Sequence, residues 1–236
     1  MGDQDRAPPA RREGGTAVDA FVEAARHAPA LASSGRGRLI FALDATMSRQ
    51  PTWDMAQALQ GRMFEAASRL GGLDVQLAYF RGMGECRVTN FVSGGAGLAE
   101  LMSRISVRGG TTQLHRVLAH ARDEARRAPV GALVFVGDAM EERVDSLLTT
   151  AAELALVGVR AFMFQEGGDP AARRAFKEIA RRTGGAYEAF NAGAAARLEA
   201  LLRAAAVYAA GGRTALAAHA EGDGCARALL EQMREA

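Results

Sequence analysis

The most constraining feature of the chain is an unbroken apolar run at residues 39–43 (LIFAL), which ends at the acidic residue Asp44. A strand with one face in water alternates apolar and polar residues, whereas a strand covered on both faces is apolar throughout. The run therefore predicts a strand in the middle of a sheet with both faces covered. Sheets of that kind are mainly parallel, with helices joining their strands.

The rest of the chain alternates between strand-like and helix-like segments, which implies right-handed crossovers. Only RGMGE separates residues 75–80 from residues 86–92, and this is too short for a crossover helix, so the two segments should form an antiparallel hairpin at one edge. The predicted fold class is α/β, a doubly wound, mainly parallel six-stranded sheet with an antiparallel edge strand and helices on both faces. Strands are expected at 39–43, 75–80, 86–92, 132–137, 159–164 and 186–190, and helices at 54–70, 98–105, 113–127, 144–156, 170–183 and 194–209.

Composition along the chain predicts one domain between two tails. The first fifteen residues are rich in Pro, Gly and charge and offer nothing to bury, so residues 1–36 are expected to be a partly disordered tail with a short helix within 17–27. Glycines follow several predicted helices, and Gly211 and Gly212 are expected to end the last helix of the domain. The predicted domain is therefore 37–211, and 212–236 is a C-terminal tail with a possible short helix at 226–233.

Charge and composition exclude several classes of partner. A formal net charge of +2 provides no strong attraction to nucleic acid, and no stretch approaches eighteen uninterrupted apolar residues, so no membrane span is expected. The N-terminal residues lack the apolar core of a secretory signal, and Cys86 and Cys225 lack metal-ligand spacing, which favours reduced thiols in the cytoplasm. Lys177 is the single lysine, and this arginine bias suggests a GC-rich bacterial genome.

Three polar clusters follow predicted strands or open a predicted helix. In doubly wound sheets, ligands bind outside the carboxyl ends of the strands, where the strand order reverses. If the strands at 39–43 and 132–137 flank that point, the clusters converge. They are Asp44, Thr46 and Ser48 after the first strand, Gly109, Gly110, Thr111 and Thr112 before the helix at 113–127, and Asp138 after the strand at 132–137.

This pattern, Asp-x-Thr-x-Ser with a distant Gly-Gly-x-Thr and a later Asp, resembles the metal-ion-dependent adhesion site of von Willebrand factor A and integrin I domains. The resemblance extends from about residue 38 to residue 210 and includes their Rossmann-like fold. It implies that a divalent cation, Mg²⁺ or Mn²⁺, is held by Asp44, Thr46, Ser48, Thr112 and Asp138. It also implies a protein partner that completes the coordination with the carboxylate of an Asp or Glu.

The match departs from the family's pattern at two positions. Thr46 stands where the family usually has Ser, which preserves the hydroxyl, and Ala139 stands where Gly is common. Thr112 is favoured over Thr111 as the ligand, because Leu114 and Leu118 then occupy the apolar positions two and six places further on.

Oxygen ligands suit Mg²⁺, which requires octahedral coordination and gives up water reluctantly. No general base or activated nucleophile accompanies them, so the chain is expected to be a metal-dependent protein-interaction module and not an enzyme. One alternative is a Mg²⁺-dependent phosphohydrolase of the haloacid dehalogenase type, but Thr46 occupies the place of its second acid and Lys177 does not match its lysine. Another is a von Willebrand factor A fold with a decayed metal site.

Several further residues have a structural interpretation beside a functional one. Trp53 is either a rim anchor for a partner or, as we favour, buried against the following helix. His115 and His120 are expected to be surface or packing residues. Glu141 and Glu142 are expected at a helix N-terminus, and the alternative role for them is to tune the charge near Asp138.

Overall fold

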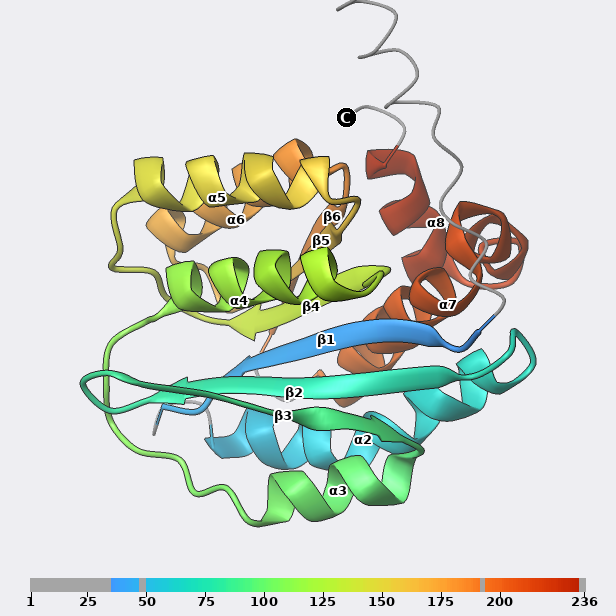
Figure 1. The fold of residues 1–236 in the computed structure, drawn as a ribbon, viewed down its shortest axis with the longest axis horizontal. Coiled ribbons are helices and arrows are strands. Elements are labelled where there is room, and N and C mark those ends of the chain that lie inside the picture. Colours follow the sequence, from blue (N-terminus) through green and yellow to red (C-terminus); the bar gives the residue numbers. More distant parts are fainter. Residues whose placement is uncertain (1–34, 47–49, 192–193, 234–236) are drawn as a thin grey trace, which may run out of the picture. The chain divides into compact units, whose positions relative to one another are not determined.

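The computed structural model describes residues 35–46, 50–191 and 194–233. Over these residues one sheet has the strand order β3-β2-β1-β4-β5-β6, and every neighbouring pair is parallel except β2 and β3 (Figure 1). The predicted fold class is confirmed. The strands are β1 Gly37–Asp44, β2 Leu73–Arg81, β3 Glu85–Ser93, β4 Ala132–Gly137, β5 Arg160–Glu166 and β6 Ala186–Phe190.

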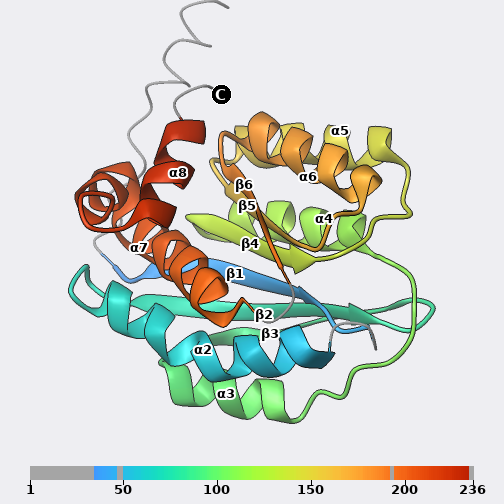
Figure 2. The same cartoon turned by 180° about the vertical axis from the view of Figure 1, so that it is seen from behind.

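Helices cover both faces of the sheet (Figures 1 and 2). The group α4, α5 and α6 covers one face, and α2, α3, α7 and α8 pack on the other side. The helices are α2 Gln50–Ser68, α3 Gly95–Ser103, α4 Leu114–Arg127, α5 Val144–Leu156, α6 Pro170–Thr183, α7 Ala195–His219 and α8 Gly224–Gln232.

The two cores explain the unbroken apolar run of β1. Because side chains alternate along a strand, Leu39, Phe41 and Leu43 join the core under α2 and α7, while Ile40 and Ala42 join the core under α4. All five side chains are at most 1% exposed. A polar residue at any of these positions would face an apolar layer, so the strand cannot alternate.

The C-terminal part of the chain differs from the prediction. The predicted helix stop at Gly212 is present as a break within α7, with φ 67° and ψ −162°, but the chain becomes helical again up to His219, and this second segment was not predicted. The short helix expected at 226–233 corresponds to α8. Leu229 and Leu230 of α8 are buried in the same core cluster as α2 and α7. The expected helix within 17–27 lies outside the described residues.

Candidate metal site

The sheet brings the two predicted aspartate ligands to one edge. Asp44 is the last residue of β1, and Asp138 directly follows β4. The two strands pair in parallel with Leu43 opposite Val136, so the carboxyl ends of both strands lie at the same end of the sheet. The chain builds outward from β1 to β2 and β3 on one side and from β4 to β5 and β6 on the other, so the strand order reverses between β1 and β4. Ligands bind at this position in doubly wound sheets.

A small cavity of about 180 Å³ opens at this edge. It contains four of the five predicted ligands, and the fifth, Ser48, lies outside the described residues. Thr112 lines the cavity, whereas the alternative Thr111 is exposed and does not. The lining residues are Asp44, Thr46, Gly109, Gly110, Thr112, Asp138, Ala139 and Glu141.

Backbone hydrogen bonds hold the loop that follows β1. The N–H of Thr46 donates to Oδ1 of Asp44 at 2.8 Å, the short turn that an Asp side chain makes with the backbone two residues on. Ala45 is fixed on both sides, since its N–H donates to the carbonyl of Phe80 at 3.0 Å and its carbonyl accepts from Arg108 at 3.0 Å. Asp44 and Thr46 are 2% and 8% exposed. The turn therefore keeps a carboxylate and a hydroxyl at the wall of the cavity.

Steric crowding explains why a glycine is required at position 110, shortly before Thr112. Gly110 lies so close to Gly82, in the turn between β2 and β3, that a Cβ at position 110 would be 2.2 Å from the carbonyl oxygen of Gly82. The N–H of Thr111 donates to that same carbonyl at 3.3 Å. Only a glycine permits this approach of two backbones. This contact holds the loop that contains Thr112 against the turn of the β2–β3 hairpin, which is distant in sequence.

Glu141 ties the loop after β4 to Thr112. Its Oε2 accepts the N–H of Thr112 at 3.0 Å, and its own N–H donates to Oγ1 of Thr112 at 3.2 Å. Thr112 Oγ1 therefore serves as an acceptor toward this loop, and an oxygen has a second lone pair for a cation. The sequence offered charge tuning near Asp138 only as an alternative role for Glu141, and it gave no signal for this reciprocal pair.

Glu142 is at a helix N-terminus as predicted, but the helix is α4, which precedes it in the chain. Its carboxylate accepts the N–H groups of Leu114 at 2.5 Å and His115 at 3.1 Å. These are N–H groups that the first turn of a helix leaves without a partner. Burial raises the pKa of Glu142, and the two N–H donors oppose that rise.

The donor set suits a hard cation. Among the residues that the structure describes, no three His, Cys, Asp or Glu side chains form a metal-binding group. The cavity offers instead the carboxylates of Asp44 and Asp138 and the hydroxyls of Thr46 and Thr112. Oxygen donors of this kind match Mg²⁺ and Mn²⁺, whereas structural zinc sites use Cys and His. The residues present therefore fit the cation that the sequence pattern implies.

The remaining candidates have structural roles. Trp53 is 2% exposed and therefore buried as predicted, but it lies within α2 and makes an edge contact with Tyr79 of β2, at 6.2 Å between ring centroids, where the prediction had it packed against the following helix. His120 Nε2 lies 2.7 Å from Oε1 of Gln76, and burial lowers the pKa of His120. Neither His115 nor His120 lines the cavity. Ala139 replaces the glycine of the family's pattern without strain, because no described non-glycine residue has a positive φ.

No protein-family model and no curated protein matches the chain. Solved structures do match it. An aerotolerance-related membrane protein from Bacteroides fragilis has 17% identity and a TM-score of 0.52, with 72% of this chain and 98% of that chain covered. The VWA domain of SpRpn10 has 10% identity and a TM-score of 0.53, with 67% and 90% covered. The chain has the von Willebrand factor A fold.

A third structure of this fold type comes from proximal thread matrix protein 1 of the mussel byssus, which carries a zinc-occupied MIDAS motif. It is 16% identical with a TM-score of 0.55, and the alignment covers 73% of this chain and 45% of that chain. At these identities the similarity establishes the fold alone. Within the described part of the chain, no helix is long and apolar enough to cross a membrane.

Proposed function

We propose that the chain is a protein-interaction module that holds Mg²⁺ or Mn²⁺ and binds an acidic group of a partner through that cation. The observation that carries the proposal is the convergence of Asp44, Thr46, Thr112 and Asp138 on one cavity. These residues come from three separate segments, namely the end of β1 with the loop after it, the loop before α4 and the loop after β4, and they meet where the strand order reverses. Ser48 is the fifth proposed ligand.

The charge balance of the site favours binding of an anion. Mg²⁺ takes about six oxygen ligands at about 2.0–2.1 Å and keeps several waters in most protein sites. Asp44 and Asp138 supply two carboxylates, and the threonine hydroxyls are neutral. A cation held in this way retains a coordination position that the carboxylate of a partner can fill.

The placement of the remaining polar groups favours binding over phosphohydrolase chemistry. A haloacid dehalogenase-type enzyme needs a second acid two residues after its nucleophile, and Thr46 stands there. Lys177 lies on α6 with Nζ 5.4 Å from the centroid of the Tyr187 ring, and it does not line the cavity. The proposed function is therefore recognition and not catalysis.

Metal binding can be tested by thermal unfolding. Because the ion binds only the folded chain, we expect millimolar Mg²⁺ or Mn²⁺ to raise the Tm of the EDTA-treated protein by a few degrees, about 2–4 °C. Asp44→Asn should abolish the shift, since the amide oxygen can still accept the Thr46 N–H but the charge is lost. Asp145→Asn, an exposed change in the first turn of α5, should retain it. Equal shifts in all three proteins would show that the cation binds elsewhere or that the site has decayed.

Partner binding can be tested by immobilising the chain and recovering proteins from an extract of its native cell. We expect EDTA to release the specific partner and Asp138→Ala to prevent its capture, because the bridging cation would be missing or weakly held. The partner should then lose most of its affinity when one Asp or Glu is changed to Asn or Gln. Retention of the same proteins with EDTA and with Asp138→Ala would place recognition on another face.

A further inference from the structure

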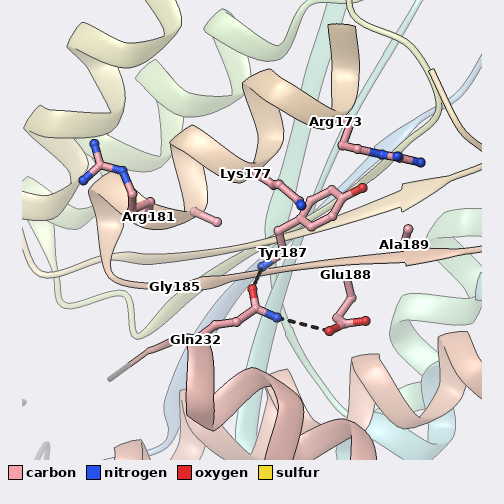
Figure 3. Close-up of a pocket in the computed structure, with 9 residues that line it drawn as sticks. Arg173, Lys177, Arg181, Gly185, Tyr187, Glu188, Ala189 and Gln232 are labelled. Carbon is pink, nitrogen blue, oxygen red and sulfur yellow. Dashed lines mark hydrogen bonds between the residues drawn. The ribbon is translucent and has the colours of Figure 1, made fainter. Parts of the chain in front are cut away.

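A larger groove, of about 680 Å³, runs along the edge strand β6 (Figure 3). Residues of α6 and α8 line it together with residues of β6, and it shares no lining residue with the metal cavity. Nothing in the proposed metal chemistry uses it. Its lining residues are Arg173, Lys177, Ala180, Arg181, Gly185, Tyr187, Glu188, Ala189 and Gln232.

The floor of the groove is a strand edge that is only partly covered. The N–H of Tyr187 points away from β5 and donates to Oε1 of Gln232 at 2.9 Å, so one side chain of α8 occupies the position of a neighbouring strand. Backbone groups alternate in direction along a strand, so the N–H of Ala189 points outward as well. Ala189 is exposed, and no hydrogen bond between described residues uses this N–H. An open edge of this kind can pair with an added strand.

One wall of the groove is basic. Arg173, Lys177 and Arg181 are spaced four residues apart and so lie on one face of α6. Arg181 is paired with Glu178 at 2.6 Å. Among the described residues, no carboxylate lies within 4.0 Å of the charged groups of Arg173 and Lys177. Within the part of the chain that the structure describes, the groove therefore keeps two cations without an acidic partner.

The acidic residue of the groove does not offset these cations. Glu188 lies on the opposite side of β6, where Gln232 donates to it at 3.1 Å (Figure 3). Arg197 also donates to Glu188, at 2.6 Å. Its charge is already neutralised by Arg197. The electrostatic field in the groove is therefore set by α6 and favours an anionic ligand.

The spacing of the cations matches an extended chain. Residues four apart on a helix are separated by about 6 Å along the axis. Alternate residues of a β-strand are separated by about 6.6 Å and point to the same face. A strand paired with β6 would therefore place every second side chain against successive cations of α6.

We propose that the groove along β6 binds an extended acidic segment of a partner protein, which adds to the sheet as a strand and directs alternate Asp or Glu residues toward Arg173 and Lys177. Main-chain hydrogen bonds to the outward groups of Ala189, and to the N–H of Tyr187 once the Gln232 side chain is displaced, would supply affinity, and the spacing of the acidic residues would supply specificity. This site is independent of the proposed metal site.

A labelled nine-residue peptide of alternating Thr and Glu, with Thr at both ends, is a suitable probe for fluorescence anisotropy with the full chain at low salt. We expect Arg173→Gln combined with Lys177→Gln to raise the Kd about tenfold. Arg174→Gln combined with Arg182→Gln changes the same net charge on the same helix outside the groove and should leave the Kd within about twofold. Equal Kd values for the two double variants would overturn recognition by the groove.

Strand addition is tested separately from charge. Ala189→Pro removes one outward N–H at a sheet edge, where proline is tolerated, and should weaken binding, whereas Ala189→Ser keeps the N–H and should not. A peptide N-methylated at every second residue tests the same bonds without altering the protein. Binding that survives both changes would overturn strand addition. Asp44→Asn should leave the Kd of the peptide unchanged, which distinguishes this site from the metal site.

Discussion

Glu142 shows how one side chain can connect two parts of the proposed metal site. It follows β4 in sequence, yet its carboxylate accepts the N–H groups of Leu114 and His115 at the start of α4. A negative charge at a helix N-terminus is also favoured by the helix dipole. Since Thr112 immediately precedes this helix region, the contact helps to fix the position of a proposed metal ligand.

We expect Glu142→Ala to lower the free energy of unfolding by about 1–2 kcal/mol, because it leaves partly buried N–H groups without an acceptor. Glu142→Gln keeps one acceptor oxygen and should cost less. Urea unfolding of the three proteins measures the difference. Glu221→Ala removes an exposed carboxylate from a turn outside the helices and serves as the control. If Glu142→Ala and the control have the same free energy of unfolding, water replaces the Glu142 carboxylate as the acceptor of these N–H groups without a loss of stability.

Individual site residues differed in how far the sequence could locate them. Asp44 and Asp138 could be located at the carboxyl ends of strands from the sequence alone. Each directly follows an unbroken apolar run, and the end of such a run predicts the end of a buried strand. The contacts of Glu141 and Glu142 could not be predicted. Their partners lie 27 to 29 residues earlier in the chain, and only the packing of α4 against the loop after β4 brings them together.

Elements were predictable where local signals mark both ends. Helix α6 begins at Pro170, after Asp169, whose side chain accepts the N–H of Ala172 at 2.6 Å, and it ends at Gly184 with φ 63°. Asp169 as the N-cap and Gly184 as the C-cap can both be recognised in the sequence. In α7 the same kind of signal marked the stop correctly, but the helical segment that follows it was not predicted. Gly212 has the positive φ of a stop, but the chain beyond it resumes a helix because its apolar residues, among them Leu216, pack into the core.

Gly212→Ala should isolate the cost of this break. A φ of 67° with a ψ of −162° is a conformation that essentially only glycine adopts, and nothing lies within 4 Å of an added Cβ. We therefore expect a loss of about 1–3 kcal/mol from backbone strain alone. Gly222→Ala, which also has open space and lacks a positive φ, should be close to neutral. Equal melting temperatures for the two variants would contradict a strained break in α7.

At the scale of the described molecule, the edge hairpin and the central strands followed from the sequence, but the docking of the last helix did not. The short link between β2 and β3 required an antiparallel pair at an edge, and apolar β1 and β4 required central positions. Helix α8 is too short for its apolar face to specify a partner surface. It packs against α7 and β6, which are formed by other parts of the chain. The predicted limit of the domain at residue 211 stays a prediction, and the burial of α8 favours a domain that extends further.

Leu229→Ala tests whether α8 is part of the domain or a dispensable tail. Leu229 is 0% exposed in the core cluster that includes α2 and α7, so truncation should leave a cavity and lower the free energy of unfolding by about 2–5 kcal/mol. Leu156→Ala is the matched control, because Leu156 is 87% exposed and its truncation should change stability by less than about 0.5 kcal/mol. Urea unfolding followed by circular dichroism should give one transition in each protein, shifted only for Leu229→Ala. If Leu229→Ala unfolds at the same urea concentration as Leu156→Ala, α8 adds no stability and the domain ends before it.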